Sequence, residues 1–269
     1  MSRRVVPDPA CVLVTGASSG LGAALALHYA APGRTLILWG RDLARLDAVA
    51  ARCREAGATV RFRSLDLANG AAALAVLRAD DAQDPVDLAV LAAGLGDMQP
   101  PGAATEQPEL VLELGLVNFT TPATLATALG QLMARRGRGQ IVLLGSVAAF
   151  HDLPYAAAYA GSKAGLSRFA TSLRLGLRGH GVGVTLVSPG FVDTPMSRRL
   201  RCAKPFLLQP GQAARRIAVA IARDQGHLVL PWQFRAIGWA STLLPPPVRG
   251  WVMRRTRAEQ APRAVTSLQ

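Results

Sequence analysis

Short apolar runs alternate with helical segments along most of the chain, and this alternation constrains the fold more than any other feature. Seven runs have the composition of strands: 11–15, 35–39, 59–64, 88–92, 140–145, 182–188 and 227–230. Several of them are apolar throughout, as expected for parallel strands covered on both faces. Between them lie helix-like segments at 22–31, 42–56, 71–79, 106–136, 157–178 and 211–224. Strict alternation of this kind predicts an α/β fold with a doubly wound parallel sheet.

The chain length suits one large α/β domain. There are 269 residues, with no internal repeat and no linker that would separate a second domain. We therefore predict a single domain over 1–269 with a core at about 10–230. Residues 231–255 break the alternation and contain Trp232, Trp239 and Trp251. Three consecutive prolines at 245–247 should break any helix running through this segment. We expect 231–255 to form an apolar and basic C-terminal extension or lid, and 256–269 to be frayed.

Composition and charge narrow the classes of protein to consider. Half of the residues are hydrophobic and 17% are charged, which argues against intrinsic disorder. Lys and Arg number 30 against 17 Asp and Glu, so the net charge is +13. Such a balance suits nucleic acid, an anionic membrane surface or a phosphorylated ligand, or it reflects an arginine-rich composition without any partner.

The cysteines and the absence of targeting signals bear on the compartment. Cys11, Cys53 and Cys202 are odd in number and lack metal-ligand spacing, so we predict no metal site and a reduced, intracellular protein. No signal peptide precedes the first strand, and no uninterrupted apolar run is long enough to span a bilayer. We expect a cytoplasmic protein.

The turn between the first strand and the first helix predicts a phosphate-binding loop. The stretch Thr-Gly-Ala-Ser-Ser-Gly-Leu-Gly at 15–22 places Gly16, Gly20 and Gly22 there. Glycine lets the backbone turn tightly and approach a pyrophosphate, and the helix N-terminus offers free N–H groups and a partial positive charge. An ordinary turn is the alternative, but the flanking strand and helix and the third glycine favour a dinucleotide site.

The end of the second strand bears on the choice of cofactor. A carboxylate at this point would bind the adenosine ribose hydroxyls and repel a 2′-phosphate. The chain instead has Trp39, Gly40 and Arg41, and the first acid, Asp42, looks like the N-cap of the next helix. Arg41, helped by Ser18, can pair with a 2′-phosphate through charge-assisted bonds. NADP(H) is therefore favoured over NAD(H), the alternative being that Arg41 is a solvated surface charge.

Tyr159 and Lys163 lie one helical turn apart and predict acid–base chemistry. A neighbouring ammonium favours the ionised form of a phenol, so Lys163 should lower the pKa of Tyr159. A dinucleotide site with such a phenol describes hydride transfer coupled to proton transfer. Tyr155 has no lysine four residues later and fits a pocket wall or the core better, and His151 is either a substrate contact or a solvated loop residue. Ser146 lacks a Gly-x-Ser-x-Gly elbow, which argues against a hydrolase.

Taken in order, these residues resemble the short-chain dehydrogenase/reductase family over about residues 10–230, which implies a Rossmann-type fold. The family's motif Thr-Gly-x-x-x-Gly-x-Gly is met at 15–22, its adenine-contacting Asp-Leu pair by Asp66 and Leu67, and its Pro-Gly with a following Thr by Pro189, Gly190 and Thr194. A structural Asn-Asn-Ala-Gly appears only in part, as Leu-Ala-Ala-Gly at 91–94, which leaves the bracing of the sheet there open.

The family's catalytic tetrad falls on Asn118, Ser146, Tyr159 and Lys163. The resemblance implies that Tyr159 exchanges a proton with the substrate oxygen as hydride passes to or from the nicotinamide. Lys163 lowers the pKa of that phenol and binds the nicotinamide ribose, and Ser146 donates to the developing oxyanion. Asn118 bends its helix around a water that links Lys163 to solvent. The implied cofactor contacts are Gly16, Ser18, Ser19, Gly20, Leu21, Gly22, Arg41, Asp66, Leu67, Ala93, Gly94, Tyr159, Lys163, Pro189, Gly190, Val192 and Thr194.

The expected function is an NADP(H)-dependent oxidoreductase acting on a ketone or aldehyde, or on the alcohol in reverse. Substrate choice should lie at 190–209, where basic and apolar residues alternate, and an apolar lid would suit a lipid-like substrate. A catalytically silent nucleotide-sensing or nucleic-acid-binding protein on this fold is one alternative, although the intact tetrad makes a nucleic-acid partner unlikely. An epimerase or dehydratase is another. We expect a homo-oligomer, and the tryptophan-rich segment either contacts an anionic membrane surface peripherally or packs on the protein.

Overall fold

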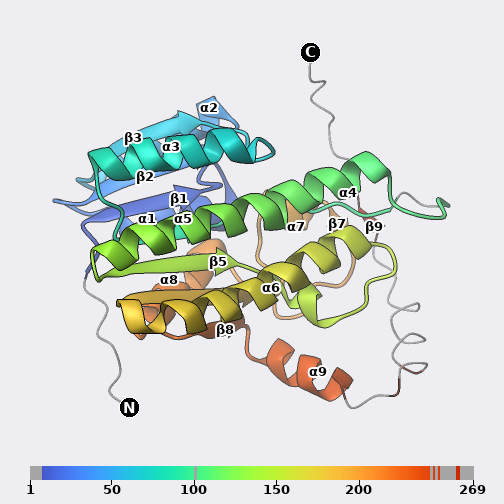
Figure 1. The fold of residues 1–269 in the computed structure, drawn as a ribbon. Helices are drawn as coiled ribbons and strands as arrows, with labels where there is room; N and C mark the ends of the chain where they lie inside the picture. Colours follow the sequence, from blue (N-terminus) through green and yellow to red (C-terminus); the bar gives the residue numbers. More distant parts are fainter. Residues whose placement is uncertain (1–7, 100–101, 243–244, 246–247, 249–258, 261–269) are drawn as a thin grey trace.

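A single seven-stranded parallel sheet organises the molecule (Figure 1). The computed structural model describes residues 8–99, 102–242, 245, 248 and 259–260. The strands follow the order β3-β2-β1-β4-β5-β6-β8, so the order reverses between β1 and β4, as in a doubly wound fold. They are β1 (Cys11–Thr15), β2 (Thr35–Gly40), β3 (Thr59–Ser64), β4 (Leu88–Leu91), β5 (Gly139–Leu144), β6 (Val182–Pro189) and β8 (His227–Leu230). Every expected strand is present, with bounds that differ by at most one residue at each end, which confirms the predicted fold class.

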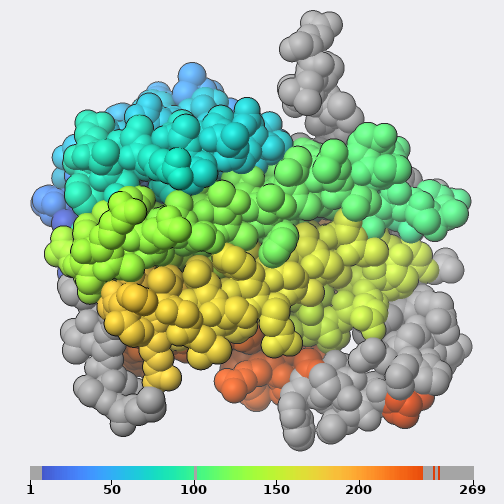
Figure 2. Space-filling view, in the orientation of Figure 1, coloured from blue at the N-terminus to red at the C-terminus, as the bar shows by residue number. Residues whose placement is uncertain are grey.

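Helices cover both faces of the sheet because alternate strand residues point to opposite sides. On one face, Val12 and Leu36 pack in a core with the helices α1 (Gly20–Tyr29), α2 (Leu43–Glu55) and α8 (Pro210–Ala222). On the other face, Leu13 and Ile37 pack in a core with the helices α3 (Gly70–Gln83), α5 (Thr121–Arg135) and α6 (Ala157–Leu177). In Figure 2 the latter three helices form parallel bands across the visible face.

The predicted helix at 106–136 is a continuous helix with a π-helical turn inside it. It consists of α4 (Pro108–Gly115), the π turn Leu116–Thr120 and α5. By length and composition alone, Pro108–Arg135 could cross a membrane, and it is the one helix among the described residues that meets this criterion. In the structure α5 packs on β5 and between α3 and α6 (Figure 1), which is the position of a core helix.

Several short elements lie outside the predicted alternation. They are the 3-10 turns Val147–Phe150 and Arg178–His180, α7 (Pro195–Arg198), β7 (Leu200–Arg201), α9 (Gln233–Thr242) and β9 (Glu259–Gln260). β9 lies in the segment 256–269 that we expected to be frayed, and it pairs antiparallel with β7. Of the expected extension at 231–255, the described residues are 231–242, 245 and 248, and the rest lies outside them, as do the remaining residues of 256–269.

The first turns of α9 pack on the body of the protein. Phe234 is buried and makes edge-to-face contacts with Phe191 and Phe206. Its ring lies so close to Gly190 that a Cβ added there would be 2.4 Å from Cε2. The described part of the extension is therefore attached to the segment that follows β6.

Candidate active site

The glycine loop lies at the carboxyl end of β1 and is shaped by close backbone contacts. Gly16 has a φ of +68°, and a Cβ added to it would lie 2.8 Å from Cα of Ala93. A Cβ on Gly22 would lie 2.3 Å from the carbonyl oxygen of Gly16. Only glycine fits these two positions, and the resulting turn brings the loop onto the end of β4. Ser19, the N-cap of α1, makes no side-chain bond to the helix, so the first turn keeps N–H groups for an anion.

Arg41 follows β2 at the expected ribose end of this loop. Its side chain is 48% exposed, and its nearest carboxylate is Glu113 of α4, with Nη1 and Oε1 3.9 Å apart. An exposed ion pair at this distance contributes little to stability, so the guanidinium of Arg41 can leave Glu113 and bind a phosphate instead. Ser18 lies beside Gly40, where an added Cβ would be 3.1 Å from the serine Oγ. Asp42 accepts a bond from the Arg45 N–H at 3.0 Å, which confirms it as the N-cap of α2.

Asn118 occupies the π-helical turn and holds the loop that follows β4. Its side chain is fully buried. Oδ1 accepts a bond from the N–H of Leu95 at 2.8 Å, and Nδ2 donates to the Leu95 carbonyl at 2.9 Å and to Ser162 Oγ at 3.3 Å. A π turn widens a helix locally. A π turn therefore lies at Asn118, where the sequence predicted a bend in the helix.

Lys163 is buried on α6, with a relative exposure of 4%. Its Nζ donates to the carbonyl of Leu144 at the end of β5, at 2.9 Å. Burial disfavours the ammonium and lowers the pKa of Lys163 to about 8. A Cβ added to Gly94 would lie 3.2 Å from Asn118 Oδ1 and 3.3 Å from Lys163 Nζ, so a glycine at this position lets the two side chains come together.

Tyr159 and Ser146 are hydrogen-bonded through their side chains. Ser146 follows β5, and its Oγ also accepts a bond from the N–H of Ala148 at 3.1 Å. Burial raises the pKa of Tyr159, and the bond to Ser146 opposes this shift. The expected lowering by Lys163 is therefore not found in this structure. Desolvation has the largest effect on the pKa of the Tyr159 phenol. The ammonium of Lys163 donates to the backbone carbonyl of Leu144 instead.

The segment after β6 closes the remaining side of the site. Thr194 caps α7 by accepting a bond from the Ser197 N–H at 3.2 Å, and its methyl group would lie 3.1 Å from a Cβ at Gly20. Val192 is buried and bridges to Leu208. The segment that contains Pro189 and Gly190 thus returns to the phosphate loop.

The predicted site residues gather at one edge of the sheet. They follow the carboxyl ends of β1, β2, β3, β4, β5 and β6, or lie on the π turn and α6. Leu67 is buried, whereas Asp66 is exposed and accepts a bond from the Ala68 N–H at 3.0 Å. His151 contacts Phe150 edge-on, and the Tyr155 carbonyl accepts a bond from the N–H of Gln99 at 2.8 Å.

Sequence reasoning missed several contacts around this edge. Ser162 donates to the Tyr159 carbonyl at 2.8 Å, and Nη2 of Arg199 lies 3.7 Å from Oδ2 of Asp97. Glu106 bonds to the backbone at the start of α6. The position of Ser162, directly before Lys163, is a local signal that could have been used. The other two contacts join residues too far apart in the chain to be read from a pattern.

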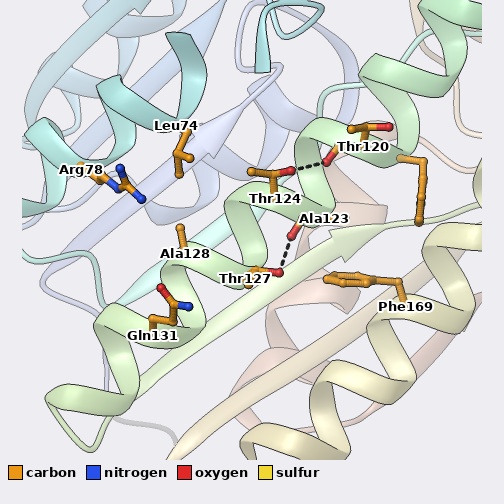
Figure 3. Close-up of a pocket in the computed structure, with 10 residues that line it drawn as sticks. Leu74, Arg78, Thr120, Ala123, Thr124, Thr127, Ala128, Gln131 and Phe169 are labelled. Carbon is orange, nitrogen blue, oxygen red and sulfur yellow. Dashed lines mark hydrogen bonds between the residues drawn. The ribbon is translucent and has the colours of Figure 1, made fainter. Parts of the chain in front are cut away.

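A surface groove lies away from these residues. It has a volume of about 500 Å³ and is lined by residues of α3, the π turn, α5 and α6 (Figure 3). No predicted site residue lines it. The hydroxyls of Thr124 and Thr127 point back to the carbonyls of Thr120 and Ala123, both at 2.9 Å, as Figure 3 shows. The site is therefore placed at the carboxyl edge of the sheet on its chemistry, and not in this groove.

Comparison with known proteins agrees with this fold. The short chain dehydrogenase family model matches residues 10–205. An uncharacterized oxidoreductase of Myxococcus xanthus is 37% identical over 91% of this chain and 96% of that protein. Among solved structures, a short-chain dehydrogenase from Sphingobium yanoikuyae in complex with NADPH has a TM-score of 0.75 and 29% identity, covering 96% of this chain and 99% of that one. The bulky-bulky ketone specific alcohol dehydrogenase from Comamonas testosteroni has a TM-score of 0.75 and 26% identity, covering 98% and 100%. The chain therefore belongs to the short-chain dehydrogenase/reductase family of NAD(P)-binding oxidoreductases.

Proposed function

We propose that this protein is an NADP(H)-dependent oxidoreductase that interconverts a carbonyl and an alcohol, with Tyr159 as the acid and base. One observation carries the proposal: the side chains of Tyr159 and Ser146 are hydrogen-bonded, and the buried ammonium of Lys163 donates to the carbonyl of Leu144, two residues before Ser146. The glycine loop and the N-terminus of α1 would hold the pyrophosphate, and Lys163 the nicotinamide ribose. When bound, the nicotinamide supplies or accepts the hydride.

In the reduction direction, Tyr159 protonates the substrate. As hydride adds to the carbonyl carbon, the oxygen gains negative charge and takes the proton from the Tyr159 hydroxyl. Ser146 stabilises that oxygen by donating a hydrogen bond. The product is an alcohol and the tyrosine is left as a phenolate. Lys163, whose pKa of about 8 lies near working pH, can return a proton to it.

Arg41 and Ser18 support NADP(H) as the cofactor. No carboxylate stands at the end of β2 before the N-cap Asp42. Within the described part of the chain, the exposed guanidinium of Arg41 is held only by the long pair with Glu113. Two solved structures of similar fold also support NADP(H) as the cofactor. One is the Sphingobium yanoikuyae dehydrogenase described in complex with NADPH, and another is a metagenomic short-chain oxidoreductase in complex with NADP, 30% identical with a TM-score of 0.69.

An apolar carbonyl compound is the proposed substrate class. The segment after β6 and α9 bring together the aromatic rings of Phe191, Phe206 and Phe234, and Met196 and Leu207 are exposed on the same segment. The Comamonas testosteroni neighbour is described as specific for bulky-bulky ketones, which supports testing such ketones first.

The test is a panel of carbonyl compounds with NADPH oxidation followed optically. The panel should contain bulky ketones, aliphatic aldehydes, sugars, steroids and quinones, with Tyr159→Phe as the control. Turnover that disappears in the variant supports the proposal. Tight NADPH binding without turnover of any compound would favour the silent nucleotide-sensing alternative, and product isomers without net oxidation would favour an epimerase.

We further propose a cytoplasmic location with peripheral attachment to an anionic membrane surface. Trp232 is 71% exposed just before α9, and Arg235 and Ile237 of α9 are exposed as well. Tryptophan and arginine beside aliphatic residues suit a membrane interface. Self-association is a separate proposal, supported by the exposed Leu112 and Leu175 on the adjoining helices α4 and α6 and tested by light scattering.

A further inference from the structure

The helix that carries Tyr159 begins without a cap of its own. The N-cap position of α6 is Ala156, which has no polar side chain, and no acidic residue lies in the first turn. The first N–H groups of a helix lack partners inside the helix and need an acceptor from elsewhere. Tyr159 is the third residue of α6 and so lies within this uncapped turn.

Glu106 supplies the missing acceptor from a distant part of the chain. Its Oε2 accepts a bond from the N–H of Ala158 at 2.9 Å, although the two residues are 52 positions apart. Its Oε1 is buried and has no hydrogen-bond partner within the described residues. The carboxylate is therefore partly desolvated at the positive end of α6, where a negative charge is favourable.

The loop that contains Glu106 also contacts the other side of the site. This loop joins β4 to α4, and Asn118 holds its beginning through both backbone groups of Leu95. Gln99 in the same loop donates to the carbonyl of Tyr155, just before α6. The loop thus connects Asn118 to the start of the helix that carries Tyr159, and Glu106 bonds directly to that helix.

We propose that Glu106 is a positioning residue for Tyr159, a cap supplied from the β4–α4 loop. The inference rests on the proposed function. The bond between the hydroxyls of Tyr159 and Ser146 joins the first turn of α6 to the end of β5, so any fraying of that turn moves the phenol away from Ser146. Glu106 holds the turn in place and does not itself touch the reacting atoms.

Three variants test this role. Glu106→Ala removes the acceptor, whereas Glu106→Gln keeps an oxygen that can accept from Ala158. Asn69→Ala is the matched control, because Asn69 caps α3 by accepting from the Ala72 N–H at 3.0 Å and α3 carries no predicted catalytic residue. For each protein we would measure the kcat and KM for the carbonyl compound found by the panel, the thermal midpoint, NADPH binding and amide exchange at 157–160.

Glu106→Ala should lower kcat about 2- to 30-fold, the range that corresponds to loss of a helix N-cap. Its NADPH affinity should stay within about twofold of the wild type, amide exchange at 157–160 should become faster, and Glu106→Gln should recover most of kcat. Asn69→Ala should lower the thermal midpoint and leave kcat and the exchange at 157–160 unchanged.

Two results would overturn the role. One is full kcat in Glu106→Ala despite a lower thermal midpoint, which would make Glu106 a stabilising cap only. The other is unchanged amide exchange at 157–160, a readout that needs no substrate. Failure of the wild type to reduce any carbonyl would count against the proposed function, and the exchange measurement would still decide whether Glu106 orders the first turn of α6.

Discussion

The side-chain amide of Asn118 bonds to both backbone polar groups of Leu95, accepting from its N–H at 2.8 Å and donating to its carbonyl at 2.9 Å. This two-bond contact holds the loop after β4, where the chain departs from the family pattern Asn-Asn-Ala-Gly. A different contact links this loop to the neighbouring strand: the Ala93 N–H donates to Thr15 Oγ1, at the end of β1, at 3.1 Å. Leu91 is buried in the core between the sheet and α3 and α5.

Asn118→Ala should lower both activity and stability. Leu95 is half-buried, and each of its backbone groups that loses its partner costs up to about 1–3 kcal/mol. Denaturant unfolding measures the loss, and NADPH oxidation with the best carbonyl compound measures kcat. Unchanged unfolding in this variant would show that water satisfies Leu95 equally well.

Tyr159→Phe should abolish turnover and leave cofactor binding near normal. The substitution removes the proton that is transferred but keeps the ring in place. Lys163→Ala should impair both, because the ammonium serves the ribose as well as the phenol. Fluorescence titration of NADPH separates binding from kcat. If Tyr159→Phe keeps most of its activity, Tyr155 becomes the next candidate for the acid.

The buried ammonium of Lys163 predicts a specific dependence of stability on pH. Its pKa is lowered to about 8 by burial, whereas it returns to its ordinary value of 10.5 on unfolding. Between these two pH values the unfolded chain binds a proton that the folded protein does not, so stability rises with pH by about 1.4 kcal/mol per unit. Below pH 8 the penalty is fully present and constant. Wild type should therefore gain a few kcal/mol relative to Lys163→Met from pH 8 to 10.5. A flat difference between the two proteins would argue against the lowered pKa.

The sheet and most of its helices could be predicted from the chain because alternation of apolar runs is a local signal. The π turn was not predicted, since the segment 106–136 keeps helical periodicity throughout. The four residues of the tetrad meet as expected, because each follows a strand end or lies on a helix that packs there. Their roles stay predictions.

Two features of the site depend on tertiary structure that no spacing reveals. The raised pKa of Tyr159 results from desolvation, which depends on everything packed around the phenol. The bond from Glu106 to Ala158 joins a loop to a helix 52 residues away. A capping partner so distant in the chain leaves no local motif, whereas Asp42 could be identified as an N-cap because it directly precedes its helix.

NADPH should bind more tightly than NADH, and Arg41→Ala should remove the preference. One desolvated arginine–phosphate pair contributes about 1.5–3 kcal/mol, or roughly tenfold to a hundredfold in affinity. Arg45→Ala is the control, since Arg45 is exposed and pairs with Asp42. Glu113→Gln should strengthen NADPH binding slightly, because it removes the carboxylate 3.9 Å from the Arg41 guanidinium. Equal affinity of the wild type for both cofactors would rule out Arg41 as a 2′-phosphate ligand.

The exposed face of α9 should bring the protein to anionic vesicles at low salt. Trp232, Arg235 and Ile237 are all exposed, while Phe234 anchors the helix to the segment after β6. Interfacial tryptophan contributes apolar contact, and arginine is attracted to anionic headgroups over a distance that salt shortens. Co-sedimentation with phosphatidylserine vesicles should therefore fall at high salt, and the double variant Trp232→Ala with Arg235→Ala should sediment less than wild type. Arg45→Ala is the control and should behave as wild type, because Arg45 lies on α2, which follows β2, whereas α9 follows β8 at the other end of the sheet. If the wild type does not sediment with anionic vesicles at low salt, the membrane proposal fails and this face is a packing or oligomer surface instead.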